Sequence, residues 1–195
     1  AKIPKGVLLY GQPGTGKTVF AEQMLFHNAS PDRPIVYVST LSEPMSKMVS
    51  YVQRFSYFDV DKLGTEIQYE DIGPMLSSDG IESLVPWLTD PIKRPSPKII
   101  VIDSFKAVHD LAPSVADRRR MVYEMPALLS AYGTTAFLLG EYTQDDILLY
   151  PDFAVADGLV DLSRRPLGTR DAPSLRLSTL RGTRPPRGPH ALRVS

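Results

Sequence analysis

The chain has 195 residues, of which 43% are hydrophobic and 23% charged, as is ordinary for one globular domain. It contains no cysteine, so a disulfide framework, a thiolate metal site and a cysteine nucleophile are excluded. No apolar run approaches the length of a membrane span and no signal peptide opens the sequence. We therefore expect a cytoplasmic protein that does not contact a membrane.

The net charge is zero, but the charges are distributed unevenly along the chain. Residues 1–161 hold 14 Lys and Arg against 21 Asp and Glu, whereas residues 162–195 hold eight Arg against Asp171 alone. Guanidinium groups suit phosphate and carboxylate, so this basic segment is either a solubilising edge or a surface for an anion or another subunit. The chain begins at Ala1 close to a predicted strand, and we expect a single domain, residues 1–195, taken from a longer protein.

The hydrophobic pattern predicts strands that alternate with helices. In chain order the expected elements are strand 7–10, helix 17–28, strand 35–39, helix 45–55, strand 66–69, helix 81–88, strand 99–102, helix 118–132 interrupted near Pro126, and strands 134–139, 159–162, 175–180 and 191–194. Strands separated by helices predict an α/β fold with a mostly parallel central sheet flanked by helices. The last three strands have no helices between them, which favours antiparallel C-terminal strands.

The strongest motif follows the first strand. The segment GQPGTGKT, residues 11–18, matches G-x-x-x-x-G-K-[ST] at every fixed position, and a helical pattern follows it. In such a loop the backbone N–H groups and the helix N-terminus bind phosphate, a lysine reaches the β- and γ-phosphates, and a threonine hydroxyl ligates Mg²⁺. The motif predicts nucleotide contacts from Gly11, Pro13, Gly14, Thr15, Gly16, Lys17, Thr18 and Val19.

A second motif is a buried strand that ends in a carboxylate. Residues 99–102 are Ile-Ile-Val-Ile, and Asp103 follows them. After a phosphate-binding loop, an aspartate in this position holds the Mg²⁺ shell, so we expect Thr18 and Asp103 to bind the metal. Alone, such an Asp is equally consistent with an ordinary turn residue.

The general base is harder to assign. Asp103 is followed by Ser104, so no glutamate stands beside the metal-binding aspartate. If strand 35–39 neighbours the strand before the loop, Glu43 would project toward the γ-phosphate and could polarise a water. From its position alone, Glu43 is more simply read as a residue that caps the N-terminus of the next helix.

These segments together resemble the KaiC-like branch of the RecA-type ATPases. The resemblance rests on residues 11–18, on the turn that holds Glu43, on Val-Ile-Asp-Ser at 101–104, on Leu-Arg-Gly-Thr at 180–183, and on Gly-Pro-His at 188–190. It covers nearly the whole chain and implies a RecA-like core that hydrolyses ATP. It also implies ring hexamers with nucleotide between subunits.

The resemblance assigns roles to individual residues and shows two departures. Glu43 falls on the second of the family's paired catalytic glutamates, and Ser42 replaces the first. Arg181 falls on an arginine that reaches the neighbouring subunit's γ-phosphate, whereas Thr179 stands where the family has a lysine. Lys17, Glu43 and, in trans, Arg181 are therefore the expected catalytic residues. Only Ser114 offers a hydroxyl between residues 107 and 120, so phosphorylation of the clock type is not predicted.

The leading hypothesis is a slow Mg²⁺-dependent ATPase that drives an oligomeric conformational switch in signalling or regulation, with a regulatory protein as partner. One alternative is an ATP-gated ring or filament scaffold with little turnover. Another is a DNA-binding recombinase relative, suggested by the basic segment, and a small-molecule kinase is a more distant one.

Other residues invite attention. Glu141 follows strand 134–139 at the edge where the site is expected, and it is a second candidate for the site. We interpret His109 and Asp110 as a surface loop pair, Arg118 to Arg120 as a solvated helix start, and Phe55 to Phe58 as core or subunit-contact surface.

Overall fold

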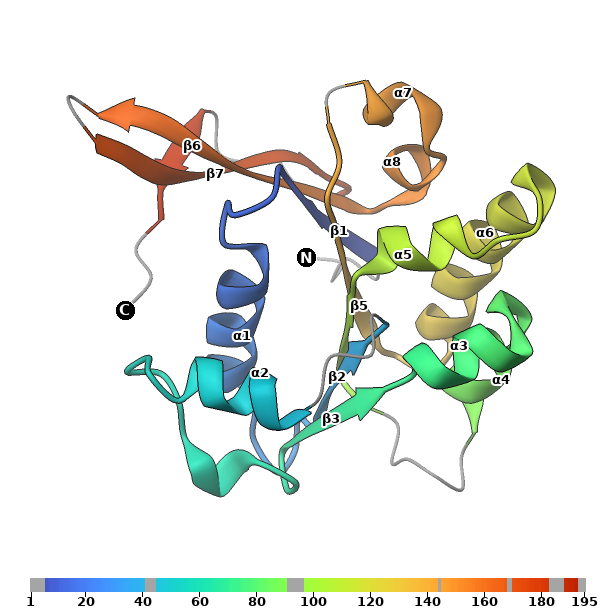
Figure 1. Ribbon diagram of the computed structural model, residues 1–195, viewed down its shortest axis with the longest axis horizontal. Helices are drawn as coiled ribbons and strands as arrows, with labels where there is room; N and C mark the ends of the chain where they lie inside the picture. The colour runs from blue at the N-terminus through green and yellow to red at the C-terminus, as the bar shows by residue number, and fades with distance from the viewer. Residues whose placement is uncertain are drawn as a thin grey trace.

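The computed structural model describes residues 6–40, 45–90, 97–143, 145–167, 170–182 and 188–192. Within these residues an eight-stranded sheet has the order β3-β2-β4-β5-β1-β6-β7-β8, and helices cover both of its faces (Figure 1). The strands are β1 Gly6–Tyr10, β2 Ile35–Ser39, β3 Ile67–Asp71, β4 Ile99–Asp103, β5 Thr135–Gly140, β6 Gly158–Leu167, β7 Arg170–Leu180 and β8 Pro189–Ala191. The helices are α1 Lys17–Asn28, α2 Met45–Val52, α3 Gly73–Asp79, α4 Leu84–Thr89, α5 Phe105–Asp110, α6 Val115–Ala131, α7 Asp146–Leu149 and α8 Asp152–Val155.

The strand directions confirm the predicted fold class. The strands from β3 to β6 in this order pair in parallel, and β7 and β8 add to β6 in antiparallel fashion. Because parallel neighbours need a crossover, the helices between them are forced onto the two faces of the sheet. The described part of the chain contains no helix that is both long and apolar enough to cross a bilayer.

The two faces bury alternate residues of the same strands. In β1, Val7 and Leu9 pack toward α1 and α2, whereas Leu8 and Tyr10 pack toward α3 to α6 and α8. All four side chains are buried. This period of two, combined with burial on both sides, explains why β1, β2 and β4 read as nearly continuous apolar runs.

Several helices differ from the expectation. Helix α6 continues through position 126, so the predicted interruption at Pro126 is wrong. A proline costs the helix one backbone hydrogen bond, but Met121, Val122, Met125 and Leu129 on either side of it are buried against the sheet, which stabilises the helix. Helices α3, α5, α7 and α8 were not expected, because each has only four to seven residues and too short a pattern to detect.

The prediction for Glu43 assumed that strand 35–39 neighbours the strand before the loop, and this assumption is wrong. Strands β4 and β5 lie between β2 and β1, so β2 does not neighbour the strand before the loop. The C-terminal end of β2 still reaches the same edge of the sheet, since all these strands are parallel. Glu43 itself lies outside the described residues.

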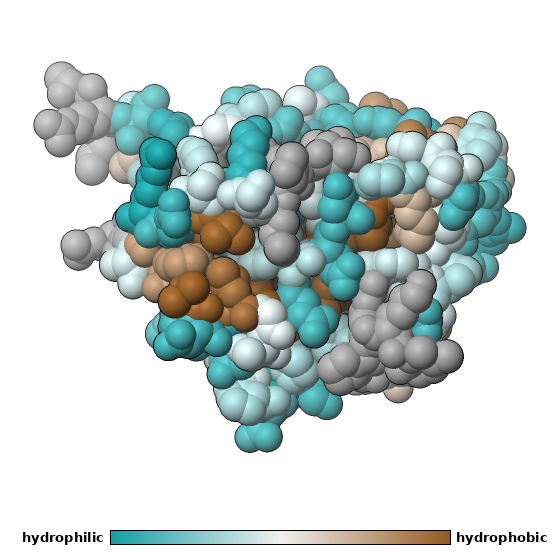
Figure 2. Space-filling model, turned by 60° about the horizontal axis from the view of Figure 1, so that its bottom comes forward, coloured by the Kyte–Doolittle hydropathy of each residue, from teal (hydrophilic) through white to brown (hydrophobic). Residues whose placement is uncertain are grey.

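An aromatic cluster lies beside α1. The rings of Phe55 and Tyr57 stack at 5.3 Å, and Phe26 contacts Tyr57 and Phe58 at 5.8 and 5.4 Å. Tyr57 and Phe58 are half-buried against the core on the α1 side of the sheet, as the core interpretation expected. Figure 2 shows the lower face, where apolar side chains (brown) gather in a compact area.

Candidate functional site

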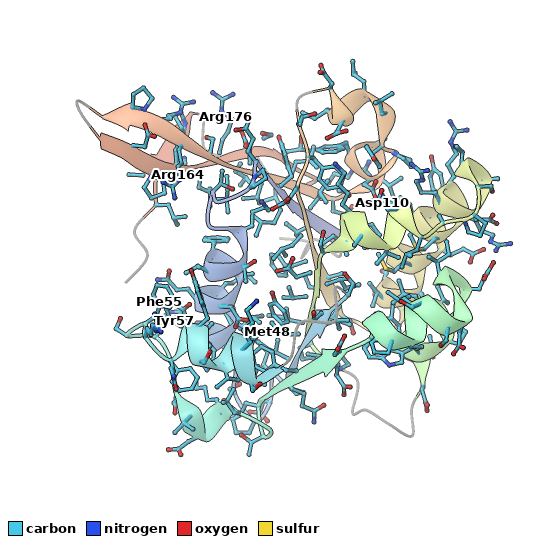
Figure 3. The ribbon with its side chains drawn as sticks, viewed as in Figure 1. Met48, Phe55, Tyr57, Asp110, Arg164 and Arg176 are labelled. Carbon is cyan, nitrogen blue, oxygen red and sulfur yellow. The ribbon has the colours of Figure 1, made fainter. Side chains whose placement is uncertain are left out.

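A cleft of about 1050 Å³ opens at the edge where the parallel strands end. Its walls come from the loop after β1, from the ends of β2, β4 and β5, and from α1, α2 and α5. Met48 on α2, Asp110 on α5 and Arg164 on β6 all line it and mark its extent (Figure 3). Ligands bind at this edge in open α/β sheets, because helix N-termini and loops converge there.

The loop before α1 takes the conformation that its glycines permit. Gly14 and Gly16 have φ angles of 73° and 92°, and Gly16 is the N-cap of α1. Gly11 has a spatial role instead, since a Cβ atom there would collide with the carbonyl oxygen of Leu162 on β6. The loop therefore presents its backbone and the start of α1 to the cleft.

The predicted nucleotide-contacting residues divide into two groups. Gly11 and Thr15 are buried residues of the loop itself, and the Thr15 hydroxyl donates to the Gln12 carbonyl at 2.9 Å. The others line the cleft: Pro13, Gly14, Gly16, Lys17, Thr18 and Val19.

Lys17 contributes a buried cation to the site. It is 8% exposed, and its Nζ donates to the carbonyls of Gly11 and Gln12 at 3.0 Å each. Burial lowers the pKa of Lys17 from its ordinary value, and the carboxylates of Glu141 and Asp103 oppose that shift. A desolvated ammonium held among carbonyls is placed to receive phosphate oxygens.

Thr18 and Asp103 meet across the cleft. The Thr18 hydroxyl donates to Asp103 Oδ2 at 2.8 Å, and the buried Tyr37 hydroxyl donates to the same oxygen at 2.6 Å. The β4 strand thus brings a carboxylate to the first turn of α1, 85 residues away in sequence. Sequence reasoning did not find Tyr37, because only the pairing of β2 with β4 reveals that it faces Asp103.

The donor set fits magnesium. A threonine hydroxyl and one carboxylate are hard oxygen ligands, and Mg²⁺ is commonly bound through one or two carboxylates together with water and substrate phosphates. Thr18 and Asp103 already lie within hydrogen-bond distance of each other, so both could reach one hydrated ion.

Glu141 brings a second carboxylate to the site. Its Oε1 lies 3.8 Å from Lys17 Nζ, and its side chain is 55% exposed. Its backbone carbonyl accepts a hydrogen bond from Lys106 Nζ at 2.9 Å, which ties the end of β5 to α5. Because β5 neighbours β1, Glu141 lies beside the loop as its predicted position required.

Arg164 is a further residue that the sequence did not reveal. It extends from β6, and its Nε and one terminal nitrogen donate to the Gly14 carbonyl at 3.2 and 2.9 Å. An arginine fork on the loop restrains it in a way that a lysine could not. The basic composition of residues 162–195 was a general signal of such contacts, but it did not single out Arg164.

Arg181 lies away from this cluster. Leu180 pairs with Gly158, and Gly158 pairs with Val7, so the end of β7 lies at the edge where the parallel strands begin. Its guanidinium donates to the Ala154 carbonyl at 2.8 Å and lies 3.8 Å from Asp157. The structure therefore does not bring Arg181 to the phosphate loop of its own chain.

The interpretation of His109 as a surface residue is wrong. His109 lies in α5 and is fully buried, with its Nε2 atom 3.1 Å from Oδ1 of the equally buried Asp152 on α8. Its ring stacks on Tyr150 at 5.5 Å and meets the edge of Phe105 at 4.8 Å. The short helices α5 and α8 enclose this pair, and neither helix could be predicted from the sequence pattern. Asp110, by contrast, is exposed.

A Gly-rich loop between a strand and a helix, with a lysine, a threonine and an aspartate gathered at one sheet edge, defines a P-loop nucleotide-binding protein. The family model described as "ATPase: KaiC" matches residues 3–195. The chain therefore belongs to the KaiC ATPase family, which has a RecA-type core, and the class supports ATP binding.

Individual relatives agree with this assignment. A UPF0273 protein of Thermotoga maritima is 23% identical over 150 residues, which cover 69% of this chain and 60% of the relative. A circadian clock oscillator protein KaiC of Picosynechococcus is 27% identical over 211 residues, which cover 99% of this chain and 40% of the relative. The chain thus spans less than two thirds of these curated relatives.

The fold is also similar to a crystal structure of a KaiC-like protein from Pyrococcus horikoshii. The TM-score is 0.79 at 22% identity, and the match covers 98% of this chain and 86% of the other. At this identity the likeness concerns the fold alone.

Proposed function

We propose that this chain binds ATP with Mg²⁺ and hydrolyses it slowly, and that contact between subunits completes the site. The observation that carries the proposal is the convergence of Lys17, Thr18 and Asp103 on one cleft at the end of the phosphate-binding loop. Membership of an ATPase family supports it.

Each residue has a separate task in the proposed reaction. The loop N–H groups and the N-terminus of α1 bind the phosphates, and Lys17 Nζ neutralises the β- and γ-phosphate charge. Thr18 and Asp103 hold the metal, which when bound supplies positive charge to the transferring phosphoryl group. Arg164 keeps the loop in place through the Gly14 carbonyl.

Two carboxylates compete for the role of base. Glu43 has the position that the family resemblance assigns to a catalytic glutamate. Glu141 lies 3.8 Å from Lys17 Nζ and belongs to the strand beside the loop. We propose Glu43 as the base and Glu141 as a partner of Lys17, because a carboxylate paired with the ammonium favours its charged form.

The intersubunit part of the proposal depends on Arg181. It lies at the sheet edge remote from its own loop, which supports a role in the site of another copy and not in its own. An arginine supplied in trans accelerates phosphoryl transfer by about 10³- to 10⁵-fold in related chemistry. A ring or filament in which ATP links subunits would couple hydrolysis to a conformational switch.

The test is Mg²⁺-dependent phosphate release from ATP by the wild type, Glu43→Gln and Glu141→Gln, with ATP binding measured alongside. We expect turnover by the wild type, loss of turnover with retained binding in Glu43→Gln, and a smaller defect in Glu141→Gln. A larger defect in Glu141→Gln would move the base to that residue. If all three bind ATP and none turns it over, the chain is an ATP-gated scaffold instead, as the departures at Ser42 and Thr179 would suggest.

A further inference from the structure

Three strands bring two tyrosines and the metal-binding carboxylate to one face of the sheet. Tyr37 on β2 pairs with Tyr69 on β3 and with Val101 on β4. Asp103 lies two residues beyond Val101, so it faces the same side of β4. This is the side covered by α1, which carries Thr18.

Two short hydrogen bonds link these side chains in pairs. Tyr37 donates to Asp103 Oδ2 at 2.6 Å, and Tyr69 donates to Glu22 Oε2 at the same distance. The two rings lie 5.3 Å apart with 37° between their planes. Glu22 is fully buried on α1, one turn after Thr18, so this arrangement spans α1, β3, β2 and β4.

Tyr37 is a fixed donor. It is 1% exposed, so its ring is held in the core and its hydroxyl is directed at Asp103. Its bond to Asp103 is as short as hydroxyl bonds to carboxylates become when the acceptor is charged.

The hydroxyl adds nothing to packing that phenylalanine would not supply. The ring already belongs to the core beside Val101, and a buried hydroxyl without an acceptor would cost stability. The acceptor that this chain provides is the carboxylate assigned to the metal. The backbone of Asp103 is held as well, because its carbonyl accepts from Thr40 N at 2.9 Å.

We propose that Tyr37 is a positioning residue for magnesium, which fixes the Asp103 carboxylate by occupying Oδ2 together with Thr18. Two hydroxyl donors on Oδ2 leave Oδ1 for the hydration shell of the ion. The inference rests on the proposed role of Asp103 as a metal-holding group.

The test measures how Mg²⁺ tightens the binding of a fluorescent ATP analogue, without reference to turnover. In Tyr37→Phe the Mg²⁺ concentration at half-maximal effect should rise about 10-fold, the lower end of what loss of an outer-shell partner costs in metal affinity. Binding of the analogue in EDTA should stay unchanged. Direct titration with Mn²⁺, followed by its electron paramagnetic resonance signal, should show the same shift.

Tyr69→Phe is the matched control. It removes the same hydroxyl from the next strand but leaves the bond to Asp103 intact, so its Mg²⁺ midpoint should remain close to that of the wild type. An unchanged midpoint in Tyr37→Phe would overturn the proposal, provided that Asp103→Asn shifts it. If Asp103→Asn shifts nothing, the metal role of Asp103 fails, and with it the basis of the inference.

Tyr37→Phe keeps the ring and its volume, and its folding can be checked by chemical denaturation. Should it not fold, 3-fluorotyrosine at position 37 provides the second measurement in the folded chain. Its ¹⁹F resonance should move when Mg²⁺ is added to the nucleotide complex, and more than that of 3-fluorotyrosine at position 69. A resonance at position 37 that does not move would overturn the proposal.

Discussion

Glu22 is a carboxyl group enclosed by other acidic and phenolic groups. Burial raises its pKa to about 8, the hydrogen bond from Tyr69 opposes the shift, and the charge of Asp103 adds to it. Tyr37 and Tyr57 also face it closely enough for its charge to raise their own pKa values. Glu22 is therefore protonated in the folded chain at neutral pH, whereas its ordinary pKa is 4.5.

This difference makes stability depend on pH. Between about pH 4.5 and 8 the folded chain holds a proton at Glu22 that the unfolded chain has released, so its contribution to stability is lost as the pH rises. Glu22→Gln cannot ionise. Its free energy of unfolding should therefore rise relative to the wild type, by up to about 1.4 kcal/mol per pH unit across this range.

Urea denaturation at several pH values provides the measurement. Glu124→Gln, at an exposed position of α6, is the control and should follow the wild type throughout. A constant difference between Glu22→Gln and the wild type from pH 5 to 8 would show that Glu22 is ionised in the fold.

Among single residues, the sequence identifies those that belong to contiguous motifs, but it does not identify those that only strand pairing brings together. Lys17 and Thr18 belong to one contiguous motif, and Asp103 ends an apolar strand, so all three could be assigned to one site, although their roles remain predictions. Tyr37 could not be assigned, because a tyrosine inside a strand is ordinary core until the register places it opposite Val101, on the face of β4 that Asp103 shares, where its hydroxyl reaches the carboxylate. Arg164 depends in the same way on where β6 passes the loop.

Short helices hold the second face of the molecule together. Helix α5 follows β4 directly and α8 precedes β6, and the His109–Asp152 contact at 3.1 Å joins them. Phe153 on α8 also meets Tyr10, the last residue of β1, edge to face at 5.0 Å. The pair therefore connects the strand that ends in Asp103 with the segment that packs on the strand before the phosphate loop.

Removing one member of this pair should be costly. Asp152→Ala removes the carboxyl group that lies 3.1 Å from the buried imidazole, and we expect a loss of about 2 kcal/mol in the free energy of unfolding. Denaturant titration measures the loss, with Asp79→Ala, at an exposed position of α3, as the control. A loss no larger than that of the control would contradict the structural role of the pair.

The double variant His109→Phe/Asp152→Leu sharpens this test. If Asp152→Ala loses stability because a buried polar group is left without a partner, and not because volume is lost, an apolar pair should recover much of the free energy of unfolding. If the double variant is less stable than Asp152→Ala alone, the cost comes from packing among Phe105, Tyr142 and Tyr150 instead.

Long helices and apolar strands were predictable, whereas short helices were not. The sequence predicted α1 because its helical period repeats over several turns, and it predicted the parallel strands because a short apolar run is enough to indicate a buried strand. It missed α5 and α8, whose four to six residues leave no period to detect, and with them it missed the burial of His109. Helix α6 shows the opposite case, since packing of its apolar face overrides the local signal of Pro126.

At the scale of the whole molecule, the two edges of the parallel sheet carry different candidate residues. The phosphate loop lies where the parallel strands end, whereas Arg181 lies where they begin, with β1 between them. The antiparallel strands β6 and β7 carry much of the basic segment, and the remainder of the chain has an acidic balance. A head-to-tail assembly would place the basic edge of one copy against the acidic body of the next, which is the arrangement that forms rings.

Mixing two inactive variants tests this arrangement. Lys17→Ala lacks a working phosphate site but retains its arginine, whereas Arg181→Ala retains the site but lacks the arginine. In randomly mixed equimolar rings, about a quarter of the sites combine an intact loop with an intact arginine from the neighbour, and phosphate release should recover to about that fraction of the wild-type rate. The rate per wild-type subunit should also fall on dilution, as subunits separate.

The matched control is a mixture of Lys17→Ala with Asp103→Asn. Both changes affect the same chain's site, because Lys17, Thr18 and Asp103 gather in one cleft, so no neighbour can restore them. Recovery in the first mixture without recovery in the second would assign Arg181 to the adjacent subunit. If the first mixture stays inactive and the wild-type rate per subunit does not change on dilution, Arg181 only holds α8 through the Ala154 carbonyl, and one chain carries the complete site.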